Sequence, residues 1–106
     1  MQEMTAATKY YFRGGSSVVA RADEYKLKDG KVQPTHGVSV YSNAERVRKW
    51  GAYQIVSVPA TLRIIQRGAD PEHFEIVPTE ALSAAAYQAA LAEVVLERYD
   101  ASEGEP

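Results

Sequence analysis

The stretch Glu72-His73-Phe74-Glu75-Ile76-Val77-Pro78 is the most informative part of the sequence, because it has the pattern of a short strand and carries titratable side chains. Successive strand side chains point to opposite faces, so Phe74 and Ile76 can enter a core while His73 and Glu75 stand together on the other face. An imidazole beside a carboxylate is a usable acid/base or charge-stabilising pair. The stretch therefore predicts a strand that presents chemistry.

The segments on either side of this stretch also favour strands. Residues 53–58 and 62–67 are β-rich runs separated by Pro59-Ala60-Thr61, and Gly68-Ala69-Asp70-Pro71 predicts a turn. Val38–Tyr41 alternates with period two, which puts Val38 and Val40 on one face and Ser39 and Tyr41 on the other. Residues 10–13 predict an aromatic strand that stops at Gly14-Gly15, so Arg13 would sit at a strand end.

The remaining pattern predicts two helices and a turn. Ser42-Asn43-Ala44-Glu45 reads as a capping box that opens a short helix to about Trp50. Thr79 would cap an alanine-rich final helix that runs to about Tyr99. Asp29-Gly30 predicts a turn, and residues 18–27 are either strand or irregular. We therefore expect an α+β domain with a mostly antiparallel sheet, a short central helix and a C-terminal helix.

The aromatic residues Trp50, Tyr53 and Tyr87 fall on apolar periodic faces, which favours a role in the core or in sheet packing. Gly14-Gly15 has part of the composition of a phosphate loop but lacks the fingerprint and the following helix. Tyr41 is the exception among the aromatic residues, because it shares a face with Ser39 and would line a pocket there rather than pack in the core.

The length of 106 residues fits one domain, and we place it at residues 9–99. We expect a frayed N-terminus over residues 1–8 and an acidic, disordered tail over residues 100–106, where little apolar surface can be buried. The ends and the body together show no signal peptide and no apolar run of membrane-spanning length. This pattern favours a cytoplasmic protein, or one exported by a dedicated secretion system.

Charge and cysteine content exclude several classes of function. The net charge of −2 supplies no strong attraction for nucleic acid. The chain has no cysteine, which excludes disulfides, thiol catalysis and thiolate metal sites. No metal site is expected.

Three polar positions project from strand-like segments that one sheet can bring together: Arg13, Ser39 and the pair His73 and Glu75. Their order, Tyr11-Phe12-Arg13, then Gly37-Val38-Ser39-Val40-Tyr41, then His73-Phe74-Glu75-Ile76-Val77-Pro78, resembles the ADP-ribosyltransferase-like toxins exported by type VI secretion systems. That family has an early aromatic-Arg, a central Gly-Thr-Ser-Val-Phe type segment and a late His-Tyr-x-Ile-Met-Pro type segment before the final helix.

The resemblance implies a split β-sheet with a cleft for NAD, which such enzymes use as a substrate. Arg13 would hold a phosphate of the dinucleotide bidentately, and Ser39 would hydrogen-bond the nicotinamide ribose. His36 would lie at the mouth of the cleft. The resemblance also implies a bacterial toxin neutralised by a cognate immunity or antitoxin protein, with either a macromolecular acceptor or water receiving the ADP-ribose.

The main catalytic residue stays open between two candidates. The family pattern has no acidic residue at the position of Glu75, so the resemblance favours His73. The chemistry of ribosyl transfer favours Glu75, because a carboxylate stabilises the positive charge that develops at the anomeric carbon as nicotinamide leaves.

Two other functions also remain open. His, Glu and Arg on a small sheet can serve as the acid, base and phosphate clamp of a toxin endoribonuclease. A non-catalytic toxin could instead inhibit its target by binding alone, with the aromatic surface and the C-terminal helix as the interface.

Overall fold

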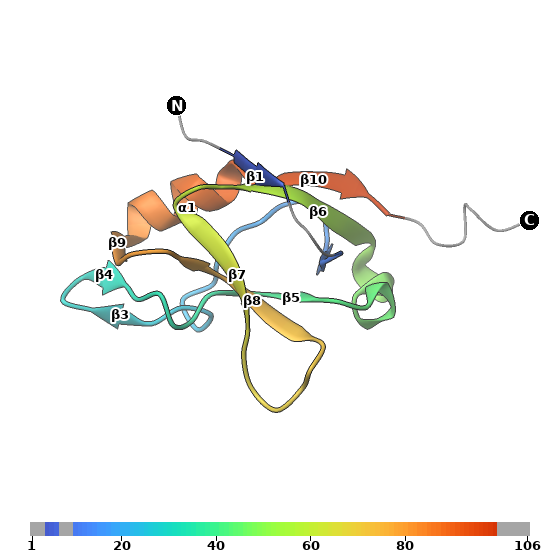
Figure 1. Cartoon of the computed structure of the whole chain (residues 1–106), viewed down its shortest axis with the longest axis horizontal. Helices are drawn as coiled ribbons and strands as arrows, with labels where there is room; N and C mark the ends of the chain where they lie inside the picture. Colours follow the sequence, from blue (N-terminus) through green and yellow to red (C-terminus); the bar gives the residue numbers. More distant parts are fainter. Residues whose placement is uncertain (1–3, 7–9, 100–106) are drawn as a thin grey trace, which may run out of the picture.

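The computed structural model describes residues 4–6 and 10–99 (Figure 1). The expected acidic tail, 100–106, lies outside the described residues. Most of the expected frayed N-terminus, 1–8, also lies outside them, and the described part of it forms strand β1 (Met4–Ala6).

Strands dominate the described residues. The other nine are β2 (Phe12–Gly14), β3 (Leu27–Lys28), β4 (Lys31–Val32), β5 (Val38–Tyr41), β6 (Ala52–Pro59), β7 (Leu62–Gln66), β8 (His73–Pro78), β9 (Leu82–Ser83) and β10 (Val95–Arg98). The helical elements are the 3-10 turns η1 (Ala44–Arg46) and η2 (Arg48–Trp50) and the helix α1 (Ala84–Ala92).

The strands form two antiparallel sheets. The larger has the order β1-β6-β2-β5-β8-β7, with β10 also paired to β6, and the smaller has the order β3-β4-β9. In Figure 1 the smaller sheet and α1 lie at one end of the molecule and the 3-10 turns at the other. This arrangement confirms an α+β fold with a mostly antiparallel sheet.

The strands expected from periodicity are present. Residues 53–58 lie within β6, 62–67 correspond to β7, and β5 and β8 have the expected bounds. Val38 and Val40 are fully buried, as their spacing predicts. The β3–β4 turn uses Asp29 and Gly30, both with positive φ, which suits a tight hairpin.

The final helix is much shorter than predicted. Ser83, not Thr79, caps it by accepting a hydrogen bond from Ala86 N–H at 3.1 Å, and the helix ends at Ala92. The apolar residues that follow fit a helical stripe in sequence, but they form β10, whose backbone pairs with β6. Tertiary pairing with an available strand edge outweighs the local helical pattern here.

The central helix is also different from the prediction. It consists of two 3-10 turns, in which Asn43 rather than Ser42 caps η1 by accepting from Glu45 N–H at 3.0 Å. Trp50, expected in the core or in sheet packing, is 59% exposed because η2 places it at the molecular surface. Tyr53 is half-buried, and Tyr87 is completely buried as expected.

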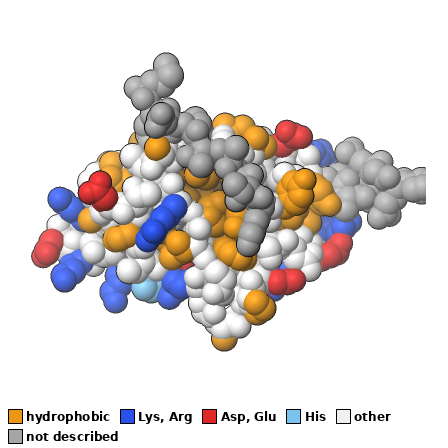
Figure 2. All heavy atoms as spheres, in the orientation of Figure 1, with side chains coloured by type: hydrophobic (Ala, Val, Ile, Leu, Met, Phe, Trp, Pro, Cys, Tyr) orange, Lys and Arg blue, Asp and Glu red, His pale blue; other side chains and the backbone are white. Residues whose placement is uncertain are grey.

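The core lies between the larger sheet and α1. Its fully buried large side chains include Val32, Val38, Val40, Ile55, Ile76, Val77, Tyr87 and Leu91. Lys and Arg side chains gather over the end of the molecule that carries β3 and β4 (Figure 2), where Lys26, Lys28 and Lys31 are exposed. Among the described residues, no helix is both long and apolar enough to span a membrane.

The start of β5 is fitted tightly against β8. A Cβ atom at Gly37 would lie 1.9 Å from the carbonyl oxygen of Ile76, so glycine is required for the two strands to meet. Next to this contact, the buried Tyr87 hydroxyl donates to the Ile76 carbonyl at 2.6 Å and accepts from Val38 N–H at 3.1 Å. Helix α1 is thereby tied to both strands.

We predict that Gly37→Ala lowers the free energy of unfolding by about 3 kcal/mol, because the added methyl group must push β5 away from β8. Gly68→Ala is the control, since a Cβ there meets no atom within 4 Å and only its positive φ is unfavourable, at about 1 kcal/mol. Urea denaturation measures both. Equal losses in the two variants would contradict the close approach.

We predict that Tyr87→Phe lowers the free energy of unfolding by about 2 kcal/mol, because it leaves the buried Val38 N–H without its acceptor. Tyr53→Phe, on the half-buried β6, controls for the loss of a tyrosine hydroxyl. A loss no larger than that of the control would show that the bridge does not stabilise the fold.

The same hydroxyl predicts a pH dependence. Burial raises the pKa of Tyr87 from 10.0 to about 12, so the folded state favours the neutral phenol. This stabilisation is complete below pH 10 and is lost as the pH rises through about 12. Between these values the free energy of unfolding of the wild type should fall more steeply than that of Tyr87→Phe. Parallel pH profiles from urea denaturation would contradict the assignment.

Candidate active site

The register of β5 against β8 brings the predicted residues together. Ser39 pairs with Glu75 and Tyr41 pairs with His73. Directly opposed residues of an antiparallel pair project from the same face of the sheet. The alternation that buries Val38 and Val40 therefore gathers Ser39, Tyr41, His73 and Glu75 on the other face.

Ser39 and His73 form a hydrogen-bonded pair. The Ser39 Oγ to His73 Nε2 distance is 3.0 Å, and His73 Nδ1 lies 2.9 Å from the backbone carbonyl oxygen of Arg67. A carbonyl oxygen only accepts, so Nδ1 carries the proton, and in the neutral ring Nε2 accepts from the serine hydroxyl. A hydroxyl held by a neutral imidazole is the arrangement of a general base and the group that it deprotonates.

Glu75 is occupied by contacts within the fold. Its Oε1 accepts from Gly37 N–H and from Arg67 Nε, each at 2.9 Å. Its Oε2 lies 3.6 Å from His73 Nε2, and its side chain is 6% exposed compared with 20% for His73. Of the two candidates on β8, His73 is thus the more accessible, while Glu75 fixes the loop before β5 and the end of the β7–β8 hairpin.

The larger sheet opens between β2 and β5. These strands share one residue pair, Phe12 with Tyr41, whereas β5 and β8 share four. Beyond that pair, side chains satisfy the backbone of Ser39 in place of a strand. Arg13 Nη1 donates to the Ser39 carbonyl at 2.9 Å, and the Ser39 N–H donates to Glu24 Oε2 at 3.4 Å. An arginine and a glutamate therefore hold the parted strand edge.

A pocket of about 360 Å³ occupies this opening. It is lined by Arg13, Gly14, Arg21, Glu24, Ser39, Tyr41, Val47 and Trp50. Three of these, Arg13, Ser39 and Tyr41, are residues that the sequence predicts at the site. Trp50 forms an exposed wall and packs on Gly14, where a Cβ would lie 3.1 Å from the Trp50 Cβ.

Arg13 is only partly satisfied at the edge of the pocket. Its Nη1 lies 3.6 Å from Glu24 Oε2, and its Nη2 donates to the Val19 carbonyl at 3.4 Å. Its Nε is buried without a hydrogen-bond partner, and no other buried side-chain nitrogen or oxygen of the described residues is in that state. A buried donor of this kind is costly unless a ligand or water completes it.

Tyr41 is clamped on the pocket face. The Arg46 guanidinium lies 4.7 Å from the centre of the Tyr41 ring, and the His73 ring centre lies 5.5 Å from it. Arg46 is in turn held by Asp70 at 2.7 Å and Glu72 at 3.1 Å. The hydrogen bond from Arg46 keeps the pKa of Asp70 below its ordinary value, and the bond to Asp70 raises the pKa of Arg46.

His36 is the predicted site residue that the structure does not place at the pocket. It lies in the loop before β5, with Nδ1 2.9 Å from Thr35 Oγ1, and it does not line the opening.

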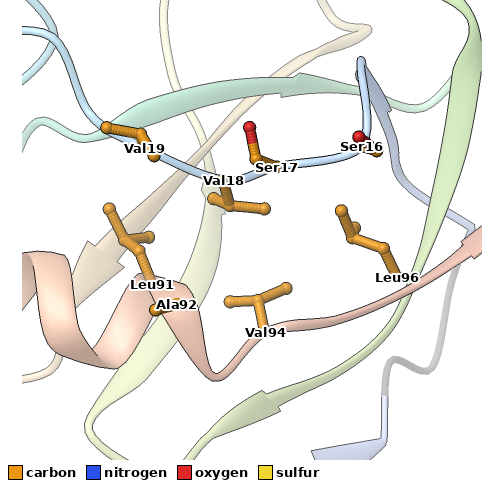
Figure 3. Close-up of a pocket in the computed structure, with 8 residues that line it drawn as sticks. All are labelled: Ser16, Ser17, Val18, Val19, Leu91, Ala92, Val94 and Leu96. Atoms are coloured by element: carbon orange, nitrogen blue, oxygen red, sulfur yellow. The ribbon is translucent and has the colours of Figure 1, made fainter.

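A second pocket of about 360 Å³ lies between residues 16–19 on one side and the end of α1 and the start of β10 on the other (Figure 3). Its lining residues are two serines and six apolar residues, none of them titratable, so it offers no acid/base chemistry.

Among the side chains that contribute to the site, those of Arg21, Glu24, Val47, Trp50 and Arg67 were not predicted there. Arg21 and Glu24 lie in residues 18–27, where the sequence has no clear period. Arg67 acts through its carbonyl and guanidinium on His73 and Glu75. The only sequence signal for Arg67 is its place as the charged last residue of the run 62–67, just before the turn that leads into the next strand.

Within residues 4–6 and 10–99, no group of three or more His, Asp or Glu residues could hold a metal ion. Comparison of the chain with known proteins gives no matching family model, no matching curated protein and no matching solved structure.

Proposed function

We propose that this protein is a small bacterial toxin with an ADP-ribosyltransferase-like fold that uses NAD, and that the opening between β2 and β5 is its substrate site. The observation that carries the proposal is the meeting of Arg13, Ser39 and Tyr41 around one pocket, beside His73. These residues come from three strands, and the family resemblance selects Arg13, Ser39 and His73 independently of their geometry.

The size of the pocket fits part of the dinucleotide. A volume of about 360 Å³ lies at the lower end of the range of about 300–1,000 Å³ for small-molecule sites. It suits the nicotinamide ribose half of NAD, with the remainder extending toward solvent past Arg13 and Arg21. Arg21 is exposed, and its ion pairs are long, 3.4 Å to Asp23 and 3.9 Å to Glu24, so a phosphate could compete for its guanidinium. Arg13 lines the pocket and has a buried Nε that lacks a hydrogen-bond partner.

The chemistry needs little from the protein beyond positioning and charge. The bond between C1′ of the ribose and the nicotinamide nitrogen breaks, and its electron pair leaves with nicotinamide. An acceptor hydroxyl or water then attacks C1′ and loses a proton. His73 Nε2 can accept that proton through Ser39, which lines the pocket, or through a water in its place, since a carbonyl holds the other ring nitrogen protonated.

A toxin of this kind requires neutralisation in the cell that makes it. We propose a cognate immunity or antitoxin protein that covers the opening. The exposed Trp50 at the wall of the pocket gives such a partner a large aromatic contact beside the site. Transfer to a macromolecule and hydrolysis of NAD both remain compatible with this site.

We predict that the purified protein releases nicotinamide from NAD and that His73→Ala slows the release about 100-fold, because it removes the proton acceptor. Ser39→Ala should slow it by a smaller factor, since His73 keeps its bond to the Arg67 carbonyl. Ser57→Ala on β6 is the matched control and should retain full activity. Chromatography of the released nicotinamide measures all four proteins, and thermal melting checks their folding.

Three outcomes would point elsewhere. A folded wild-type protein that neither binds nor consumes NAD would remove the enzymatic proposal. Growth inhibition that survives combined alanine substitution at Arg13, Ser39, His73 and Glu75 would favour a toxin that acts by binding, whereas degraded cellular RNA after induction would favour an endoribonuclease.

A further inference from the structure

We infer that Glu24, which neither the sequence pattern nor the family resemblance selects, is the carboxylate that stabilises the positively charged ribose during nicotinamide release. This inference rests on the proposed function and assigns a catalytic residue to the same pocket. Ribosyl transfer needs a carboxylate that faces the pocket, and Glu75 does not line the pocket.

The two carboxylates differ in what they face. Glu75 is saturated on Oε1 by two 2.9 Å hydrogen bonds and lies away from the pocket lining. Glu24 lines the pocket, although its side chain is only 8% exposed. A carboxylate that borders a cavity while shielded from bulk water acts strongly on charge inside that cavity, because solvent screens it little.

The contacts of Glu24 leave it capacity for a ligand. Its Oε1 accepts from Arg21 N–H at 3.0 Å, and its Oε2 accepts from Ser39 N–H at a long 3.4 Å. The ion-pair distances are also long, 3.6 Å to Arg13 Nη1 and 3.9 Å to Arg21 Nε. A carboxylate offers about four lone-pair sites, so a ribose hydroxyl can still be accepted.

The segment that carries Glu24 is held in place although it has no regular structure. On one side of it, the Gln88 side chain on α1 binds both backbone groups of Ala20, at 3.1 Å from its N–H and 2.8 Å from its carbonyl oxygen. On the other side, the Tyr25 ring packs against Tyr87 with ring centres 5.7 Å apart. Anchors on both sides fix the carboxylate before substrate arrives, which is what electrostatic stabilisation of a transition state requires.

The step balances without any further cofactor. As the bond from C1′ to nicotinamide breaks, positive charge spreads over C1′ and the ring oxygen of the ribose. The negative charge of Glu24 stabilises this positive charge. The attacking water or acceptor hydroxyl supplies the new bond to C1′, and its proton passes through Ser39, which lines the pocket, to His73. Glu24 keeps its charge throughout and forms no bond to the sugar.

The test compares Glu24→Gln with Glu75→Gln, using NAD as substrate and Glu97→Gln on the exposed part of β10 as the control. Glutamine keeps one oxygen, which can still accept from Arg21 N–H, and loses only the acceptor of the long 3.4 Å bond from Ser39 N–H. Thermal melting therefore checks that each variant is folded. We expect Glu24→Gln to lower kcat for nicotinamide release about 100-fold, with KM changed less than threefold. Glu24→Asp, which keeps the charge, should recover part of that loss.

Glu75→Gln should mainly lower the melting temperature, because it weakens the pair with Arg67. Full kcat in a folded Glu24→Gln variant would overturn the inference while leaving the proposed function intact. A raised KM and a lower melting temperature with unchanged kcat would also overturn it, since Glu24 would then only support the strand edge. If the wild type does not release nicotinamide, both the proposed function and this inference fail.

Discussion

The pairing of β5 with β8, locked at its start by Gly37 and the Tyr87 hydroxyl, is the constraint on which the rest of the structure depends. A buried phenol that donates to one strand and accepts from the other fixes their relative position as well as their distance. A slip of one residue would turn every side chain of β5 to the opposite face. The two valines would then leave the core, and Ser39 would leave His73.

The same strand shows how the fold creates a site at its other edge. Toward β8, β5 is fully paired, and this pairing supplies stability. Toward β2, one residue pair is made, and the backbone of Ser39 is satisfied by Arg13 and Glu24 instead. Side chains in place of a strand leave room for a ligand, so the opening combines a satisfied backbone with an accessible pocket. Arg13 and Glu24 consequently have a structural role in addition to the roles proposed for them.

The features that could be predicted from the sequence are those set by residues close together in the chain. The alternation in Val38–Tyr41 and in the stretch from Glu72 to Pro78 predicted two strands and their faces, because each pattern depends on side chains two residues apart. The predicted helix to Tyr99 was wrong, since residues 95–98 complete a strand edge on β6 that lies some forty residues earlier in the chain. Trp50 was misplaced for a related reason, because 3-10 turns follow a different period from the α-helix that was expected. Glu24 could not be found at all, since its segment is positioned by Gln88 and Tyr87 on α1 rather than by its own periodicity.

The sequence alone determined the α+β class, the main strands and the faces within each strand, with Ser39 beside Tyr41 and His73 beside Glu75, because these follow from local spacing. Only the tertiary structure decided what each of these groups can do. Burial and the bonds to Gly37 and Arg67 turn Glu75 inward, the carbonyl of Arg67 sets the proton position on His73, and the parting of β2 from β5 makes the pocket. The physical reason is that spacing specifies the direction of a side chain, whereas its partners and solvent exposure depend on segments that are distant in the sequence.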